Sequence, residues 1–547
     1  MSVPVIPLIH TARRGASDFA LTPAVPVVAP AELEAVARRF VSDLATDSPI
    51  DLDVATDAPL GVAIRLELAA DGLDALPATG GIRADGDSHA DERHGLAIAE
   101  NGIRVWGATP EAVHRGLTTL RQLITAHAGD GVAQLPALEA VDAPRFAWRG
   151  LSLDVARTFH DVETVRRVID MCSLYKLNVL HLHLTDDQGW RLEVPEWPSL
   201  TEVGARGAFG DRQGGFYTRA DVASLVDYAA DRFVTIVPEI DMPGHTAAVF
   251  ASYPELAPEN PLTIESIPGF DLSIGTLDPD RELTWTFVND VVRSAVEQFR
   301  QSAYVHLGGD EAFGMADEAH AAFVDRAISV IKDHGKLALG WQEIARAGIG
   351  AGDVVQYWME PNESADGFES DALKAMVPEA FLPMLLETLA KSVHDVPTAL
   401  DKGATLLVSP TSRLYFDRPH LAESADPAQE ETRARVGLPV YPPASLRDGV
   451  EWDPIDETPV VDSDDRIGGV EAAVWCETVT SRDDLEFLLL PRLAGAGEKA
   501  WAARNTTEWA SYSARLAGQA GAWDRRGWNW FRSSEVAWPA PAVAQAQ

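Results

Sequence analysis

Two adjacent carboxylates follow a short apolar run near the middle of the chain. The segment Tyr304–Gly308 predicts a buried strand, and Gly308 and Gly309 end it where the backbone turns sharply. Asp310 and Glu311 come next. At the carboxyl end of a strand in a parallel barrel, such a pair is equipped to cleave a glycosidic bond. The competing interpretation is a helix whose first turn holds Asp and Glu to suit the helix dipole.

A second group of titratable side chains follows an earlier predicted strand. The sequence Pro-Glu-Ile-Asp-Met-Pro-Gly-His brings Glu239, Asp241 and His245 into one turn-rich segment. A lone histidine is usually a satisfied polar group, whereas three titratable groups at one strand end favour a functional site.

His181 and His183 alternate on another predicted strand and therefore point to the same face, shortly before Asp186. A His-x-His pair at a barrel strand end would also suit a zinc hydrolase. We favour a polar role in the barrel wall, or hydrogen bonding to Asp186, because a metal hydrolase needs neither the acid pair nor stacking tryptophans. The sequence thus predicts no metal and no cofactor.

Three tryptophans, Trp341, Trp358 and Trp475, end three different predicted strands. Each alone would more often fill a core, but together they can wall a pocket that grips an apolar ring face or a methyl group. Further polar candidates at strand ends are Arg157, Tyr415, Asp417 and Glu477.

The elements that must position these residues alternate as strands and helices after Pro144, which predicts βα units and a parallel sheet. Eight such units make a (β/α)₈ TIM barrel. An open doubly wound sheet is disfavoured because no Gly-rich phosphate turn follows any predicted strand. The predicted strands are 151–155, 179–184, 234–240, 304–308, 337–341, 354–358, 405–409 and 469–475, with helices over 162–175, 220–233, 285–299 and 317–334.

The rest of the chain predicts a small α+β domain before the barrel and a short closing segment after it. We place the domains at 1–143, 144–505 and 506–547. The first holds strands at 61–68, 94–99 and 102–106 and a helix that starts at Thr109-Pro110-Glu111. Insertions over 256–281 and 418–466 follow strands, where a barrel builds its pocket. We also expect helical structure over 371–400 and one helix over 509–522, packed on the barrel.

Composition limits the partners. The 547 residues carry 83 acidic and 45 basic side chains, and the formal charge of −38 repels phosphate backbones and anionic lipid. Nucleic acid and membrane partners are therefore not expected. With only Cys172 and Cys476, no disulfide framework can form. Residues 1–19 lack the pattern of a signal peptide, so we expect a cytoplasmic protein. A secretory leader removed before this sequence begins would leave the same pattern.

With these residues in view, the chain resembles the family 20 glycoside hydrolases, the β-N-acetylhexosaminidases. The resemblance runs from about His94 to Trp538 and covers the small α+β domain and the barrel. Several long motifs in one order carry it: His306-x-Gly308-Gly309-Asp310-Glu311, Lys176-Leu177-Asn178 through Trp190-Arg191, Pro238 through His245, and Trp148-Arg149-Gly150 through Arg157. The first ninety or so residues match only loosely.

The resemblance implies a retaining exo-glycosidase that removes terminal β-linked N-acetylglucosamine or N-acetylgalactosamine. The 2-acetamido oxygen of the substrate would attack the anomeric carbon in place of a carboxylate, giving an oxazolinium intermediate. Glu311 would be the acid and base, Asp310 would hold the acetamido N–H, and Tyr415 would hydrogen-bond its carbonyl oxygen. Trp341, Trp358 and Trp475 would enclose its methyl group.

By the same resemblance, Arg157 would bind O3 and O4 of the sugar, Asp417 and Glu477 would bind O4 and O6, and Asp186 and His245 would form a supporting pair near Glu311. A member that releases a disaccharide or acts on a chitin fragment is an alternative. A sugar-binding protein that has lost turnover is another, disfavoured by the intact acid pair.

Overall fold

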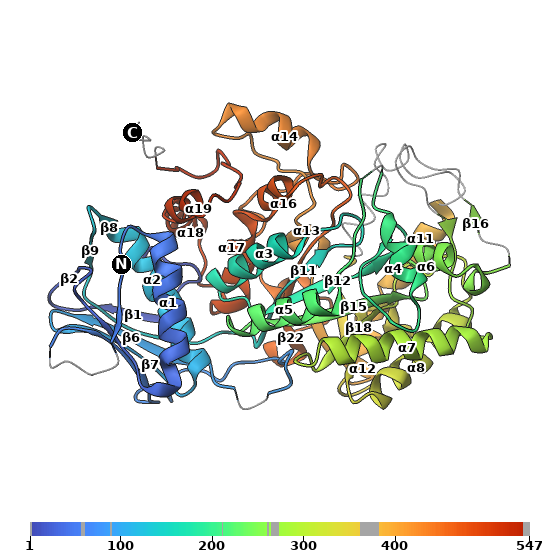
Figure 1. The fold of residues 1–547 in the computed structure, drawn as a ribbon, viewed down its shortest axis with the longest axis horizontal. Helices are drawn as coiled ribbons and strands as arrows, with labels where there is room; N and C mark the ends of the chain where they lie inside the picture. Colours follow the sequence, from blue (N-terminus) through green and yellow to red (C-terminus); the bar gives the residue numbers. More distant parts are fainter. Residues whose placement is uncertain are drawn as a thin grey trace.

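A closed barrel of parallel strands forms the larger part of the molecule (Figure 1), as the sequence predicts. The computed structural model describes residues 3–55, 61–87, 90–210, 212–259, 262–263, 273–360 and 382–539. In order around the barrel, its strands are β11 (Trp148–Asp154), β12 (Val179–His183), β15 (Thr235–Met242), β18 (Tyr304–Gly308), β19 (Leu337–Trp341), β20 (Val354–Tyr357), β21 (Thr405–Val408) and β22 (Ile467–Val474).

These segments form strands because both of their faces are covered. All seven residues of β11, all five of β18 and all eight of β22 are buried, as near-continuous apolar runs in a parallel barrel require. Between β15 and β18 the register shifts from Glu239 to Met242. Such an irregularity redirects side chains at the end of a strand.

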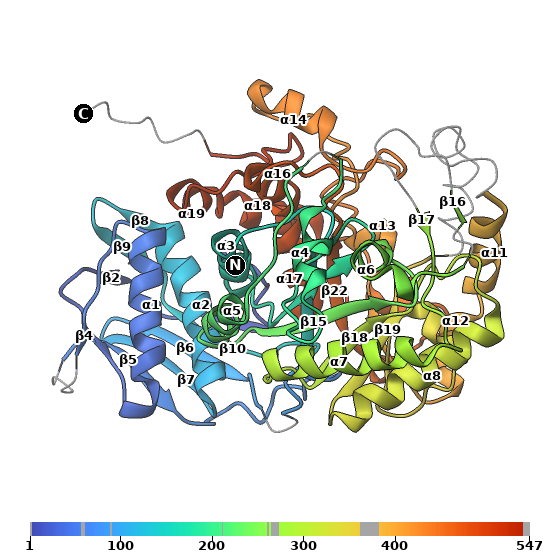
Figure 2. The same cartoon turned by 45° about the vertical axis from the view of Figure 1, so that its right-hand side comes forward.

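Helices follow the strands and cover the outside of the barrel (Figures 1 and 2). α3 begins after Asp161, whose side chain accepts the Thr164 N–H, and α5 begins at a capping box of Thr218 and Asp221. The principal barrel helices are α3 (Val162–Leu174), α5 (Arg219–Ala230), α7 (Glu282–Gln298), α8 (Asp317–Asp333), α12 (Asp395–Asp401), α16 (Arg482–Leu489) and α17 (Arg492–Trp501).

Shorter helices lie in the loops: α4 (Ser199–Glu202), α6 (Ala247–Ser252), α13 (Thr411–Leu414), α14 (Glu430–Arg435) and α15 (Pro454–Glu457). Within the predicted helical stretch 371–400, the structure shows α11 (Leu382–Ser392) and the start of α12. Residues 371–381 of that prediction lie outside the described residues. No helix among the described residues combines the length and the apolar composition needed to cross a bilayer.

The amino-terminal part is a seven-stranded sheet in the order β1-β10-β6-β7-β5-β3-β4, with α1 (Glu34–Asp47) and α2 (Pro110–His127) on one face (Figure 2). Its predicted hairpin is β6 and β7, and α2 begins after Thr109 as predicted. The strands are β1 (Thr11–Arg14), β3 (Val27–Val28), β4 (Val54–Ala55), β5 (Ile64–Leu68), β6 (His94–Ala99), β7 (Gly102–Gly107) and β10 (Leu138–Asp142).

The closing segment differs from the prediction of one helix over 509–522. The structure has α18 (Trp509–Ala517) and α19 (Ala520–Arg525) instead. The chain breaks at Gly518, because glycine is a poor helix former and suits a helix end. Trp523 on α19 donates its Nε1–H to the Tyr175 hydroxyl at 2.7 Å, which anchors the segment next to α3.

A buried ion cluster joins the amino-terminal domain to the amino end of the barrel. Glu92 lies 2.5 Å from Arg149 Nη2, 2.8 Å from Arg115 Nε on α2, and 3.2 Å from Arg83 Nη1. Burial alone would raise the pKa of Glu92, but the attraction of Arg149 and Arg115 outweighs it and holds that pKa well below the usual range. Glu92 is therefore ionised between three cations.

We expect Glu92→Gln to lower the free energy of unfolding by about 3–5 kcal/mol, because it leaves buried guanidinium groups without their counter-charge. The exposed pair of Glu34 and Arg38 gives a control, since Glu34→Gln should cost less than about 1 kcal/mol. Denaturant unfolding followed by tryptophan fluorescence measures both.

The folded-state pKa of Glu92 is depressed, so its contribution to stability is present above the unfolded-state pKa of about 4.3 and is lost as pH falls through the folded value. The difference between wild type and Glu92→Gln should therefore shrink below about pH 4. Equal costs for the Glu92 and Glu34 substitutions would contradict this account of the domain junction.

Candidate active site

A pocket at the carboxyl ends of the barrel strands collects the predicted site residues. Ten of the eleven line it: Arg157, Asp186, His245, Asp310, Glu311, Trp341, Trp358, Tyr415, Trp475 and Glu477. The eleventh, Asp417, is fully buried behind this lining, and its Oδ1 accepts the backbone N–H of Trp475 at 3.4 Å. The structure therefore brings all eleven to one end of the barrel.

Two glycines place the acid pair at this end. Gly308 and Gly309 have φ of +71° and +93°, and a Cβ on Gly308 would come within 1.7 Å of Asp241 Oδ1. Only glycine lets the end of β18 pass that close to β15. The N–H of Gly309 also donates to Asp241 Oδ1 at 3.3 Å. Glu311, with φ of 45°, continues the left-handed turn, a conformation that costs energy outside glycine and collects at functional sites.

His245 links the acid pair to a third carboxylate. Its Nε2 lies 3.6 Å from Asp310 Oδ2 and 3.6 Å from Glu311 Oε2, while its Nδ1 lies 3.3 Å from Asp186 Oδ1. The other oxygen of Asp186 pairs with Arg157 Nη2 at 2.7 Å. Five charged or titratable groups thus form one continuous chain across the pocket.

Among these five groups, the surroundings shift the pKa values of Glu311 and His245. Burial raises the pKa of Glu311 to about 7, with attraction by His245 and repulsion by Asp310 acting in opposite directions. Burial would lower the pKa of His245, but Asp186 and Asp241 outweigh it and hold that pKa well above its usual range. At neutral pH, Glu311 is therefore divided between its protonated and ionised forms beside a positive imidazolium, as a general acid and base requires.

Aromatic rings form another part of the pocket lining. The ring centroids of Trp341 and Trp475 lie 5.8 Å apart, those of Tyr415 and Trp475 6.0 Å apart, and Trp358 stacks on Tyr415 at 6.3 Å. Trp358 Nε1–H donates to Glu343 Oε2 at 3.2 Å. These contacts hold the rings in a box that suits a small apolar group.

Four lining residues are absent from the predicted set: His183, Asp241, Leu438 and Tyr441. The sequence draws attention to Asp241, which follows Glu239 on β15, and to His183, which alternates with His181. Tyr441 had no such signal. It lies in the insertion over 418–466, and its ring meets Tyr415 edge-on at 6.0 Å.

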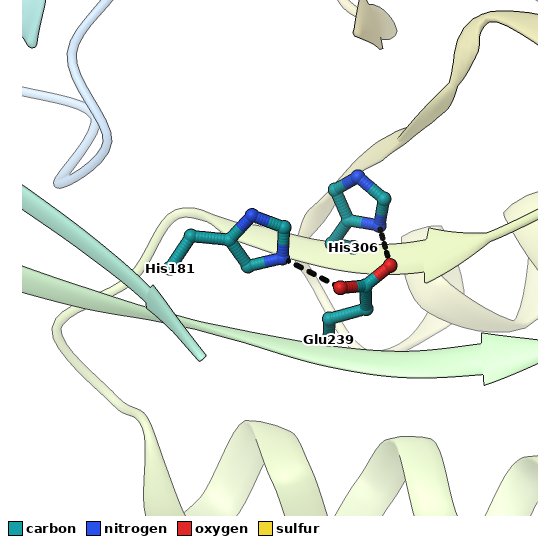
Figure 3. A group of neighbouring side chains, drawn as sticks. All are labelled: His181, Glu239 and His306. Atoms are coloured by element: carbon teal, nitrogen blue, oxygen red, sulfur yellow. Dashed lines mark ion pairs between the residues drawn. The ribbon is translucent and has the colours of Figure 1, made fainter. Parts of the chain in front are cut away.

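The histidines behind the pocket pair with carboxylates in the barrel interior. Figure 3 shows Glu239 between His181 and His306, at 3.0 Å from each ring. His183 Nε2 lies 2.9 Å from Asp186 Oδ2, in line with the predicted hydrogen-bonding role. His183 thus has the predicted hydrogen bond, whereas the buried Nε2 atoms of His181 and His306 have no hydrogen-bond partner among the described residues.

Comparison with known proteins fits this geometry. The sequence model of the glycosyl hydrolase family 20 catalytic domain matches residues 146–504, and that of domain 2 of the same family matches residues 2–143. A β-N-acetylhexosaminidase of Cellulomonas fimi is 38% identical over 454 residues, which is 83% of each chain.

Two similar solved structures cover almost the whole chain. The GH20 β-N-acetylhexosaminidase of Streptomyces coelicolor A3(2) superposes with a TM-score of 0.79 at 30% identity, over 98% of this chain and 99% of that one. The N-acetyl-β-hexosaminidase of Streptomyces plicatus, in complex with Thio-NAglucal, gives a TM-score of 0.78 at 30% identity over 98% of both chains. The chain therefore belongs to glycoside hydrolase family 20.

Proposed function

We propose that this protein is a retaining exo-glycosidase that removes terminal β-linked N-acetylglucosamine or N-acetylgalactosamine, with the acetamido group of the substrate as the nucleophile. One observation carries the proposal: the acid pair Asp310 and Glu311 shares its pocket with the aromatic box of Trp341, Trp358 and Trp475. That box matches an acetamido methyl group. The Streptomyces plicatus relative forms complexes with Thio-NAglucal and, as a mutant, with the product GlcNAc, which supports an N-acetylated sugar as the ligand of this chain.

In the first step, Glu311 gives its proton to the glycosidic oxygen while the acetamido carbonyl oxygen attacks the anomeric carbon. The bond to the leaving group breaks, and the alcohol departs with the proton. Asp310 accepts the acetamido N–H and stabilises the positive charge of the oxazolinium intermediate, while the Tyr415 hydroxyl donates to the carbonyl oxygen. The ionised Glu311 then takes a proton from water, whose oxygen attacks the anomeric carbon and restores the acetamide.

Unpartnered polar atoms in the pocket lining and directly behind it fit this substrate. Among the described residues, Asp310 Oδ1, Asp417 Oδ2 and Glu477 Oε2 are buried and have no hydrogen-bond partner. Buried acceptors of this kind are costly unless a ligand satisfies them. An acetamido N–H and the O4 and O6 hydroxyls of a terminal sugar would do so, with Arg157 binding O3 and O4.

Two alternatives remain distinguishable by experiment. A family member that releases a disaccharide or cuts a chitin fragment would use the same acetamido chemistry on a longer substrate. A sugar-binding protein would keep the pocket and lack turnover, which the presence of both Asp310 and Glu311 in the lining argues against.

The first prediction compares 4-nitrophenyl N-acetyl-β-glucosaminide with the plain β-glucoside. Because only the first carries the internal nucleophile, we expect its kcat/KM to be at least about 10³-fold higher. Nitrophenol release measures both, and the matching galactosaminide reports the preferred epimer. Equal rates on both glucosides would contradict acetamido participation. Release from neither would favour a sugar-binding protein, and chitobiose release from a longer oligomer would favour the disaccharide-releasing alternative.

The second prediction tests the acid. Glu311→Gln should lower kcat about 10²- to 10⁴-fold on substrates with poor leaving groups and much less on a dinitrophenyl glycoside, which needs no proton to depart. Asp310→Asn provides the matched change at the adjacent carboxylate. It should lower kcat on both kinds of substrate, because it weakens the charge partner of the intermediate. If Glu311→Gln lowered kcat equally on substrates with poor and with good leaving groups, Glu311 could not be the acid.

The third prediction concerns pH. Hydrolysis requires protonated Glu311, so kcat/KM should fall as pH rises through its pKa of about 7. His245→Gln removes a positive neighbour and raises that pKa, so the alkaline limb should move to higher pH. His320→Gln is the control, because His320 Nε2–H donates to the Gly309 carbonyl oxygen at 2.8 Å and its lowered pKa leaves it uncharged. A limb that stays in place, or moves down, in His245→Gln would refute this coupling.

A further inference from the structure

One carboxylate in the barrel interior contacts both the aromatic box and the charge chain of the acid. Glu239 is fully buried on β15, and four side chains meet it. His183 Nδ1 lies 2.6 Å and His181 Nε2 3.0 Å from its Oε2. His306 Nδ1 lies 3.0 Å and Trp341 Nε1 2.8 Å from its Oε1. Figure 3 shows two of these contacts converging on its two oxygens.

On the aromatic side, Glu239 fixes the indole of Trp341. The Nε1–H donates to Glu239 Oε1, and the indole is buried with 1% exposure. Without this acceptor, a buried N–H would lose its partner, and the ring would be free to rotate away from Trp475. The orientation of this wall therefore depends on a group outside the pocket lining.

On the acid side, Glu239 fixes the imidazole of His183. Its Nδ1 faces Glu239 Oε2 at 2.6 Å and its Nε2 faces Asp186 Oδ2 at 2.9 Å. An imidazole between two carboxylates satisfies both only when both nitrogens carry a proton. Asp186 in turn meets His245 at 3.3 Å, and His245 lies 3.6 Å from Glu311. Two histidines and two carboxylates thus lead from the barrel interior to the acid.

Of the other groups around His183, the Arg157 guanidinium opposes a protonated ring and the carboxyl groups favour one. Arg157 Nη1 lies 3.3 Å from its Nε2, and Asp241 lies within 4.8 Å together with Asp186. Burial would lower the pKa of His183, but Glu239 and Asp186 outweigh it and hold that pKa well above the usual range. Each positive group near this ring therefore faces a carboxylate.

The remaining neighbours of Glu239 are accounted for in the same way. His181 lies between Glu239 and Glu471, 2.9 Å from Glu471 Oε1, and its pKa is raised to about 9: burial lowers it and the two carboxylates outweigh burial. His306 has a lowered pKa through burial, and its Nδ1 accepts the Gly308 N–H at 3.0 Å, so it is neutral. Two protonated histidines, His181 and His183, thus lie against the carboxyl groups of Glu239 and Glu471.

We propose that Glu239 is a positioning residue for hydrolysis. It keeps His183 protonated and holds Trp341 in place, so that one group positions both Glu311 and the aromatic box. This proposal rests on the proposed function. Glu239 touches neither substrate nor reacting atoms in this account; it acts through His183 and Trp341. A substitution at Glu239 should consequently change both the pKa of Glu311 and the orientation of Trp341 in the aromatic box.

The test is Glu239→Gln with Glu471→Gln as the matched control. Both replace a fully buried glutamate of the barrel interior. Glu471 contacts His181, Trp148 and Gln356, at 2.9, 2.7 and 3.0 Å, and so hydrogen-bonds to neither His183 nor Trp341 directly. His181 is the neighbour that it shares with Glu239. A merely structural role predicts the same effect for both substitutions.

We expect Glu239→Gln to lower kcat on the N-acetylglucosaminide roughly 10- to 100-fold, because the acid and the acetamido group lose their alignment. The neutral amide no longer supports a proton on both nitrogens of His183. The variant therefore lacks the negative charge of Glu239 and the positive charge of His183. Because His183 is nearer to Glu311 along this series of contacts, the net effect on Glu311 is a loss of positive charge. The pKa of Glu311 should rise, and the alkaline limb of kcat/KM should move to higher pH. Glu471→Gln should leave that limb in place. Equal shifts in both variants, or none in Glu239→Gln, would overturn the proposal.

A proton NMR measurement keeps the proposal testable if Glu239→Gln fails to fold. In the wild type, the downfield imidazole N–H signals that disappear in His183→Gln should persist to pH 8, because His183 stays protonated. A neutral His183 in that range would overturn the proposal. The NMR measurement does not depend on turnover. If the wild type showed no preference for N-acetylated substrates, the proposed function would be refuted, and the protonation state of His183 would still test the role of Glu239.

Discussion

The pairing of buried charges is the constraint on which the catalytic end of this barrel depends. An ionised side chain taken out of water is costly unless an opposite charge and hydrogen bonds replace the solvent. Asp186 shows how the barrel meets this requirement, because Arg157, His183 and His245 all contact it within 3.3 Å. Any change that removes one of these partners alters the charge that Glu311 experiences. The pKa of the acid is therefore a property of the whole cluster.

The backbone supplies the second constraint, since the acid pair must leave the barrel wall at one point. The close approach of Gly308 to Asp241 excludes a side chain there, and the irregular pairing of β15 with β18 lies at the same place. Charge pairing and backbone geometry thus meet between two neighbouring strands. This is why two separate sequence motifs, one on each strand, are needed to build a single site.

Much of the fold could be predicted because its signals are local. A buried parallel strand is a short apolar run, and β18 was predicted with its exact ends since glycines and acids bound it. The eleven site residues followed from strand ends and from the resemblance to known glycosidases. The contact of Glu239 with Trp341 joins residues 102 positions apart and leaves no trace in either segment alone. Tyr441 comes from an irregular loop and has no periodic signal. Gly518 ends α18 within a stretch whose apolar pattern predicts one continuous helix.

The two ends of the barrel differ in how their buried charges are paired. We connect the amino end with stability and the carboxyl end with function. At the amino end, Arg149 meets Glu92 of the first domain and Lys176 meets Asp142 at 2.9 Å, so the protein itself provides the counter-charges. At the carboxyl end, Asp417 Oδ2 and Glu477 Oε2 lack partners among the described residues. Unsatisfied buried acceptors lower stability, and a ligand that donates hydrogen bonds to them offsets that cost. The junction with the first domain then stabilises a barrel whose other end carries buried acceptors that the hydroxyls of the proposed substrate would satisfy.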